Sequence, residues 1–137
     1  MALGTLVDTN VLLDVLTDDP TWALWSSEAL VAAAESGPLW INPIFYAEVS
    51  VRFSRIEDLE EARPADDYRR AQLPWEAAFL AGKAFVQYRR RGGAKTSTLP
   101  DFYIGSHAAV ADMALLTRDG TRYQTYFPTV TLITLDR

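Results

Sequence analysis

The 137-residue chain has no cysteine and only one histidine, His107, and these absences exclude several kinds of site. Without thiols there is no disulfide framework, no cysteine nucleophile and no zinc site built on cysteine. A single imidazole excludes a multi-histidine zinc site and leaves one candidate base for a histidine-dependent triad. His107 lies in the middle of an expected helix, and we interpret it as structural.

Long apolar runs and positively charged residues are also scarce. The apolar runs extend over only a few residues, far short of the roughly 20 that span a bilayer, and residues 1–4 lack the features of a signal peptide. We therefore expect a cytoplasmic protein with no membrane partner. The 18 carboxylates against 13 Lys and Arg give a formal charge of −5, which disfavours nucleic-acid binding unless basic residues cluster or a cation intervenes.

The chain does contain short apolar segments that alternate with segments of helical periodicity. The expected strands cover residues 4–7, 39–41, 72–73, 114–117 and 130–133, and the expected helices cover about 11–16, 22–36, 44–56, 75–91 and 100–113. Residues 57–70 are highly charged and are expected to be helical in part. Strands separated by helices predict an α/β protein with a parallel sheet and helices on both faces. No linker or repeat divides the chain, so we expect a single domain over residues 1–137.

Large apolar residues give the expected helix over 75–91 a clear pattern. One face of it carries Trp75, Ala78, Phe79, Gly82, Phe85 and Val86. Tryptophan side chains of this kind are expected in the core or at an interface rather than as platforms for base stacking.

Two acids directly follow expected strands. Asp8 comes after the first strand, and Asp119 comes just after the strand at 114–117. Because ligands of open parallel sheets bind outside the carboxyl ends of the strands, both acids are candidate site residues. The alternative is that each one only caps the helix that follows it.

Glu48 and Asp101 are the other candidate acids, and both lie on expected helices. Glu48 interrupts an apolar face, where a carboxylate is costly unless it is paired, protonated or bound to a cation. The alternative is an intrahelical ion pair with Arg52, four residues later. Asp101 lies in the first turn of its helix, where a negative charge also suits the helix dipole.

Taken together, these four carboxylates point to a metal-dependent reaction. Acids that converge on one point repel each other strongly unless a divalent cation holds them. Oxygen ligands without histidine or cysteine favour Mg²⁺ or Mn²⁺ over zinc. Such an ion suits phosphodiester hydrolysis, because it lowers the pKa of bound water and offsets charge at phosphorus.

Four parts of the sequence, in this order, resemble a PIN domain: Asp8–Asp14, Glu48, Asp101–Ala108 and Leu115–Asp119. The tail, Tyr123–Pro128 followed by Val130–Leu135, is similar to the VapC-type toxins of type II toxin–antitoxin systems. The resemblance implies a three-layer α/β/α fold with a central parallel sheet of four or five strands. It also implies an endoribonuclease toxin that uses Mg²⁺, or Mn²⁺, to cleave structured cellular RNA such as tRNA or a ribosomal RNA loop. The implied partners are a cognate antitoxin and a second copy of the chain, within a larger toxin–antitoxin assembly.

The resemblance assigns roles residue by residue. The acidic quartet that binds the metal and activates the attacking water corresponds to Asp8, Glu48, Asp101 and Asp119. Asn10 and Thr117 match polar positions that steady the carboxylates through hydrogen bonds.

The remaining charged residues give weaker signals. A basic cluster could contact RNA phosphates or could merely complement a helix dipole: Arg89, Arg90, Arg91 and Lys95. Arg118 could likewise contact substrate, or it could pair with a neighbouring carboxylate. We interpret the acids that flank the first helix as a solvated turn, and extend this reading to one near a later helix end: Asp14, Asp18, Asp19 and Asp112.

Two other functions fit parts of this pattern. The first is phosphoryl transfer with Asp8 as nucleophile, although phosphatases of the haloacid type place a second Asp two residues on, where this chain has Asn10. The second is a non-catalytic module whose acidic groove binds a basic peptide. A beryllofluoride adduct on Asp8 would favour the first, and metal-dependent RNA cleavage by the isolated protein would exclude the second.

Overall fold

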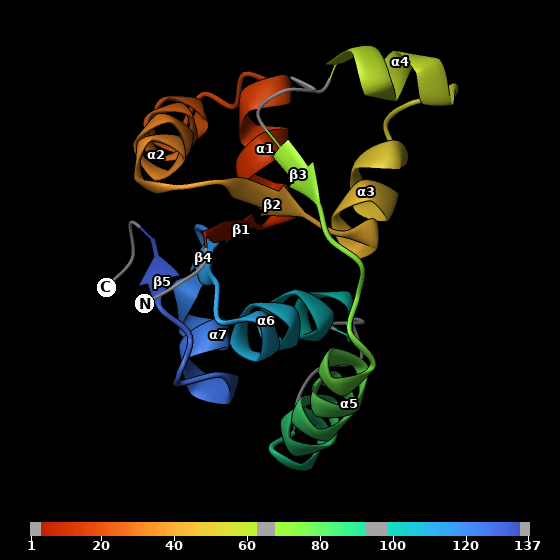
Figure 1. Ribbon diagram of the computed structural model, residues 1–137, viewed down its shortest axis with the longest axis vertical. Helices are drawn as coiled ribbons and strands as arrows, with labels where there is room; N and C mark the ends of the chain where they lie inside the picture. The colour runs from red at the N-terminus through yellow and green to blue at the C-terminus, as the bar shows by residue number, and fades with distance from the viewer. Residues whose placement is uncertain (1–3, 63–67, 93–98, 135–137) are drawn as a thin grey trace.

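The structure, a computed structural model, describes residues 4–62, 68–92 and 99–134. Five short parallel strands form one sheet in the order β3-β2-β1-β4-β5 (Figure 1). The strands are β1 (Thr5–Val7), β2 (Leu39–Ile41), β3 (Tyr68–Arg70), β4 (Ala114–Leu116) and β5 (Leu132–Ile133). The predicted α/β class and the parallel sheet are therefore confirmed.

Helices cover both faces of the sheet, which makes three layers (Figure 1). One face packs against α1 (Thr9–Leu16), α2 (Ala23–Ser36), α3 (Pro43–Ser50) and α4 (Ile56–Ala62). The other packs against α5 (Trp75–Arg90), α6 (Leu99–Ala111) and α7 (Gly120–Tyr126). Successive strand residues serve the two layers in turn: Leu6 packs with α5, α6 and α7, whereas its neighbour Val7 packs with α1 to α4.

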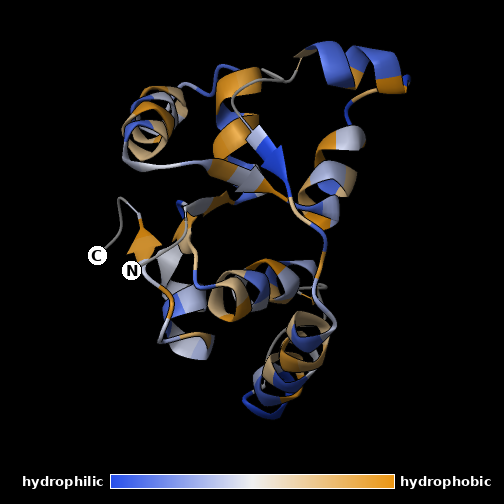
Figure 2. Cartoon of the chain, viewed as in Figure 1, coloured by the Kyte–Doolittle hydropathy of each residue, from blue (hydrophilic) through white to orange (hydrophobic). Residues whose placement is uncertain are grey.

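The expected strand at 72–73 was wrong, because the third strand is β3 at Tyr68–Arg70. This edge strand has two exposed arginines in place of an apolar run, and Figure 2 shows it as hydrophilic. Charged side chains are a common protection of sheet edges, and here they also pack on aromatic rings. The guanidinium of Arg69 lies 5.8 Å from the ring centroid of Trp40, and that of Arg70 lies 5.1 Å from Tyr46.

Two helix expectations also need correction. The helix predicted over 44–56 ends at Ser50, and α4 begins separately at Ile56. Between them, the backbone N–H groups of Arg52 and Phe53 donate to carbonyls three residues back, and this tighter turn returns Phe53 to the core. The short helix α7 was not predicted, because its mostly polar sequence shows no apolar periodicity.

The most deeply buried residues of α5 are small. Ala77, Ala81 and Ala84 are buried, and the hydroxyl of Ser106 on α6 donates to the carbonyl of Ala77 at 2.8 Å. The predicted apolar face of this helix is divided: Phe85 packs against the core, whereas Phe79 and Val86 are exposed. Trp75 is 88% exposed, so of its two expected places, core or interface, it does not have the first.

Helices α6 and α7 approach each other closely at Gly105. A Cβ atom at this position would lie 2.5 Å from Cδ2 of Phe127 and 2.9 Å from Cδ1 of Tyr123. Both distances are shorter than real Cβ contacts, so the two rings require a glycine here. Among the described residues, none of the helices is both long and apolar enough to cross a bilayer.

Candidate active site

Asp8 lies at the carboxyl end of β1, where the backbone turns into α1. Its N–H donates to the carbonyl of Leu116 at 2.9 Å, which fixes the residue against the end of β4. Although Asp8 occupies the N-cap position of α1, its side chain makes no capping hydrogen bond. Instead, its Oδ2 atom accepts from the hydroxyl of Thr117 at 2.8 Å and from the phenol of Tyr123 at 3.1 Å. The capping alternative therefore does not describe this side chain.

Burial raises the pKa of Asp8 to about 6, from an ordinary value of 3.8. The hydrogen bonds from Thr117 and Tyr123 act in the opposite direction, because they stabilise the carboxylate. The negative charges of Asp101 and Glu48 raise the pKa further. These two acids, 93 and 40 residues away in sequence, thus lie close enough to repel Asp8.

The carboxylate of Glu48 points toward α1 and does not pair with a residue of its own helix. Its Oε1 atom accepts a hydrogen bond from the hydroxyl of Thr9 at 2.6 Å. Arg52, the alternative partner, is exposed, and no ion pair joins the two side chains. The half-buried carboxylate is therefore held next to the end of β1.

Asp101 lies in the first turn of α6, and a hydrogen bond fixes α6 relative to α3. Asn42, the N-cap of α3, accepts from the backbone N–H of Phe45 through Oδ1. Its Nδ2 atom then donates to Nδ1 of His107 on α6, at 3.0 Å. Both side chains are buried, and burial lowers the pKa of His107, so the imidazole is neutral and accepts. This agrees with a structural role for His107.

The three acids line a single hollow of about 210 Å³ at the carboxyl edge of the sheet. Its walls are Asp8, Thr9, Asn10, Leu13, Glu48 and Asp101. Among the described residues, only the Oδ1 atom of Asn10 is a buried side-chain polar atom without a hydrogen-bond partner. An amide steadies a carboxylate through its Nδ2 group, so the expected role of Asn10 stays a prediction. Its Oδ1 atom is a possible metal ligand that has no hydrogen-bond partner beside three acids.

These features fit a hard divalent cation. The donors are oxygens, the acids repel each other, and one buried carbonyl oxygen lacks a partner. Within the described ranges, no three acidic or histidine side chains approach closely enough to enclose an ion. An ion here would therefore have one or two direct carboxylate ligands and would keep several waters, as Mg²⁺ commonly does.

Asp119 follows β4 but does not line the hollow. It is exposed, and its N–H donates to the hydroxyl of Thr117 at 3.0 Å. Its charge contributes to a raised pKa of Tyr123, so its carboxylate lies near that phenol. Thr117 thus links two of the four predicted acids, since one hydroxyl donates to Asp8 and accepts from the backbone of Asp119.

The prediction that Asp14 belongs to a solvated turn was wrong. The carboxylate is buried and accepts two hydrogen bonds from Arg118, at 2.8 and 3.1 Å, and a third from Ser26 at 2.8 Å. The guanidinium of Arg118 also lies 5.3 Å from a ring centroid of Trp22. Of its two predicted roles, Arg118 therefore has the structural one here, and it anchors the loop that carries Asp119.

The predicted basic cluster lies at the C-terminal end of α5. Arg89, Arg90 and Arg91 are exposed, and Lys95 lies outside the described residues. Two of the guanidinium groups are above rings, that of Arg89 at 5.7 Å from Phe85 and that of Arg91 at 5.5 Å from Tyr126.

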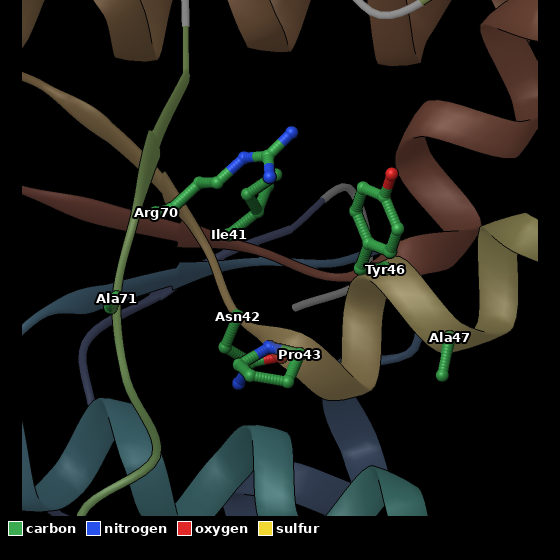
Figure 3. Close-up of a pocket in the computed structure, with 7 residues that line it drawn as sticks. All are labelled: Ile41, Asn42, Pro43, Tyr46, Ala47, Arg70 and Ala71. Carbon is green, nitrogen blue, oxygen red and sulfur yellow. The ribbon is translucent and has the colours of Figure 1, made fainter. Parts of the chain in front are cut away.

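A second hollow, of about 300 Å³, lies at the ends of β2 and β3 (Figure 3). It is lined by Ile41, Asn42, Pro43, Tyr46, Ala47, Arg70 and Ala71. The guanidinium of Arg70 is paired with Glu60 at 2.7 Å, and the phenol of Tyr46 donates to the same carboxylate. The positive charge of Arg70 is therefore neutralised by Glu60. No acid lines this hollow, so the hollow offers no second metal site.

Sequence reasoning missed three residues of the site: Thr9, Asn42 and Tyr123. Each carried a usable signal. Thr9 is adjacent to Asp8, Asn42 follows β2 as Asp8 follows β1, and Tyr123 is one helical turn after Asp119.

Comparison with known proteins shows which folds this structure resembles. No curated protein matches the chain. The fold is similar to that of VapBC2 from Rickettsia felis bound to a promoter DNA fragment, with a TM-score of 0.70 and 18% identity over 96% of this chain and 98% of that one. It is also similar to a toxin–antitoxin complex from Klebsiella pneumoniae, with a TM-score of 0.64 and 22% identity over 88% and 90% of the two chains. VapBC-1 from nontypeable Haemophilus influenzae gives 0.70 and 14% over 95% and 96%.

The sequence itself carries the family assignment. The model of the PIN domain family matches residues 5–127, from the start of β1 to the residue after α7. This span includes all four predicted acids and every hydrogen-bond partner described for them. The protein therefore belongs to the PIN domain family.

Proposed function

We propose that this protein is a Mg²⁺-dependent endoribonuclease and the toxin of a toxin–antitoxin pair. The observation that carries the proposal is the hollow shared by Asp8, Glu48 and Asp101, in which the mutual repulsion of the acids contributes to the raised pKa of Asp8. Acids held together against their own repulsion need a cation, and nucleases use such a cation to cleave phosphodiesters.

Asp8, Glu48 and Asp101 would hold the ion, some directly and the rest through its bound waters, together with Oδ1 of Asn10. Thr117 and Tyr123 both bond to Oδ2 of Asp8, so neither of these bonds occupies its Oδ1 atom. Thr9 orients the carboxylate of Glu48, which we assign either to the ion or to the attacking water. Bound Mg²⁺ supplies a lowered water pKa and a charge that offsets the negative phosphate.

The remaining steps concern the substrate. Attack of water on the phosphorus would release the 3′ oxygen as a hydroxyl and leave a 5′-phosphate on the other fragment. Asp119, whose charge acts on Tyr123, would be the fourth acid of the site. The acidic field of the chain, with a formal charge of −5, makes the cation necessary for RNA to approach.

The solved structures that the fold matches are toxin–antitoxin complexes, and this supports an antitoxin as the protein partner. We extend the proposal to a homodimer of this chain and to a structured RNA, such as a tRNA or a ribosomal RNA loop, as substrate. An antitoxin would suppress the activity by covering the acidic hollow.

Cleavage of RNA by the purified full chain tests this function. We expect cleavage with Mg²⁺, none with EDTA, and none by Asp8→Asn. Asp112→Asn is the matched control, because Asp112 is exposed and has a left-handed backbone (φ 56°) that asparagine tolerates. Cleavage that survives EDTA, or full activity of Asp8→Asn, would refute the nuclease assignment.

A further inference from the structure

The two carboxylate oxygens of Asp8 have different surroundings. The Oδ2 atom accepts two hydrogen bonds, from the hydroxyl of Thr117 at 2.8 Å and from the phenol of Tyr123 at 3.1 Å. A carboxylate oxygen accepts about two such donors, so Oδ2 is fully used inside the protein. Neither bond involves Oδ1, and Asp8 is one of the residues that line the acidic hollow. Oδ1 is therefore the oxygen that Asp8 can offer to an ion.

The two donors cannot leave Oδ2 without a cost. Tyr123 and Thr117 are both buried, so a hydroxyl that left Asp8 would lose this partner without gaining bulk water. The ring of Tyr123 is also held by α6, because a Cβ at Gly105 would lie only 2.9 Å from its Cδ1 atom. The hydroxyl of Thr117 accepts from the backbone N–H of Asp119 at 3.0 Å, and this bond directs its own hydrogen toward Asp8.

Glu48 has a similar restraint on α3. Its Oε1 atom accepts from the hydroxyl of Thr9 at 2.6 Å, and Thr9 is itself buried. The other oxygen of this carboxylate, Oε2, is not part of that bond. Two acids of the hollow, which come from different elements of the fold, therefore each have one oxygen engaged by a buried hydroxyl of the protein.

The number of oxygens that the acids present decides which divalent ion the hollow suits. Ca²⁺ takes about six to eight oxygens, and a carboxylate that binds through both of its oxygens commonly supplies two of them. Mg²⁺ takes about six, dehydrates reluctantly, and is commonly held by one or two carboxylates while it keeps several waters. Acids that present one oxygen each thus deprive Ca²⁺ of ligands that Mg²⁺ does not use.

We propose that the acidic hollow is selective for Mg²⁺ over Ca²⁺ because hydroxyl groups of the protein limit two of its acids to one metal-binding oxygen each. Thr117 and Tyr123 impose this limit on Asp8. Thr9 imposes it on Glu48. The inference rests on the proposed function, which assigns a Mg²⁺ site to these acids, and it adds which residues determine the identity of the ion. All three are positioning residues, since they act on the ion only through the carboxylates.

Isothermal titration calorimetry of the full chain with Mg²⁺ alone and with Ca²⁺ alone tests the selectivity without any RNA. The natural protein should bind Mg²⁺ at least as tightly as Ca²⁺. In the double variant Thr117→Val/Tyr123→Phe, which frees Oδ2 of Asp8, the dissociation constant for Ca²⁺ divided by that for Mg²⁺ should fall by at least about tenfold. Thr9→Val should change this ratio in the same direction. Protonation of Asp8 competes equally with both ions, so a change in its pKa cancels in the ratio.

The matched control is the double variant Thr125→Val/Tyr126→Phe, which removes a threonine and a tyrosine hydroxyl from α7. Thr125 donates to the carbonyl of Thr121, and the ring of Tyr126 packs on Phe102, with 5.2 Å between the ring centroids. The control should therefore have the ion preference of the natural protein. Circular dichroism confirms that each variant is folded.

If the double variant at Thr117 and Tyr123 does not fold, Tyr123→Phe alone carries the test, because it keeps the ring and the bond from Thr117. Its ratio should fall by about threefold. A natural protein that prefers Ca²⁺ overturns the proposal, and so does a ratio that is unchanged, moves toward Mg²⁺ or changes equally in the control. RNA cleavage with Mg²⁺ would still support the nuclease in those cases. A natural protein that binds neither ion overturns the inference and the proposed metal site together.

Discussion

Asn42 donates a hydrogen bond to His107 at 3.0 Å, and this buried contact joins the start of α3 to the middle of α6. Glu48 lies on the first of these helices and Asp101 on the second. Two acids of the hollow are therefore positioned relative to each other by a pair of residues that carry no charge. The amide is oriented unambiguously, because its Oδ1 atom already accepts from Phe45.

Asn42→Ala should lower the free energy of unfolding by about 2–4 kcal/mol, because it removes a helix cap and leaves a buried imidazole nitrogen unpaired. Urea denaturation measures this. Asn42→Ser separates the two losses, since serine retains a capping oxygen but cannot reach His107. A serine variant as unstable as the alanine variant would show that the cap contributes nothing.

Mg²⁺ should bind more weakly as the pH falls through about 6, because protonated Asp8 loses its charge there. Metal-dependent thermal shifts between pH 5 and 8 measure this. Without metal the stability has the opposite trend. The folded pKa of about 6 exceeds the ordinary 3.8, so the free energy of unfolding should fall by about 3 kcal/mol as the pH rises from about 3 to about 7, and roughly half of this fall lies above pH 5. Asp8→Asn should show neither effect, and a natural protein indistinguishable from it would contradict both.

Thr117→Val should raise the pKa of Asp8, because it removes a hydrogen bond that stabilises the carboxylate. The pH at which Mg²⁺ binding is half lost should then move upward, which the same thermal-shift titration detects. Thr125→Val is the control, since Thr125 is exposed and its hydroxyl donates only within α7, to the carbonyl of Thr121. An unchanged midpoint in Thr117→Val would mean that this hydroxyl does not tune Asp8.

Arg118→Ala should destabilise the fold by about 1–3 kcal/mol. It leaves the buried Asp14 carboxylate without its cation, although the guanidinium is one third exposed and is partly screened by water. Equilibrium unfolding of Arg118→Ala, Asp14→Asn and the double variant forms a thermodynamic cycle. The two single losses should exceed the double loss, and strictly additive values would show that the pair makes no net contribution. RNA cleavage should also fall in Arg118→Ala, because Asp119 is the next residue.

The elements that the sequence predicts well are those whose apolar residues face the core. The segments at 39–41 and 114–117 are buried between two helical layers, and their continuous apolar runs show it. Tyr68–Arg70 forms a strand by backbone pairing at the sheet edge, where arginine side chains are tolerated, so no run marks it. The apolar periodicity of α5 predicts a helix correctly, but it does not show which face of the helix packs on the core. The alanines pack inward where α6 lies close, Trp75 and Phe79 point outward, and Phe85 packs on Phe102.

The four acids can be selected from the sequence because a carboxylate after a strand, or on an apolar helix face, violates a local expectation. The residues that position these acids cannot be selected from the sequence in this way. The bond from Tyr123 to Asp8 spans 115 residues and the bond from Asn42 to His107 spans 65, and neither tyrosine nor asparagine is out of place where it occurs. Asp14 shows the converse error, since an acid near a turn is ordinarily solvated, and only the fold brings Arg118 to it.

Gly105 affects the acidic hollow as well as the packing of α6. The two rings that occupy the space of its absent side chain are those of Phe127 and Tyr123, and the second of these holds Asp8. One extra methyl group on α6, at a position outside the hollow, would displace a phenol and so alter how readily Asp8 gives up its proton. A substitution at a glycine far from the acids in sequence would thus change the acidic hollow itself.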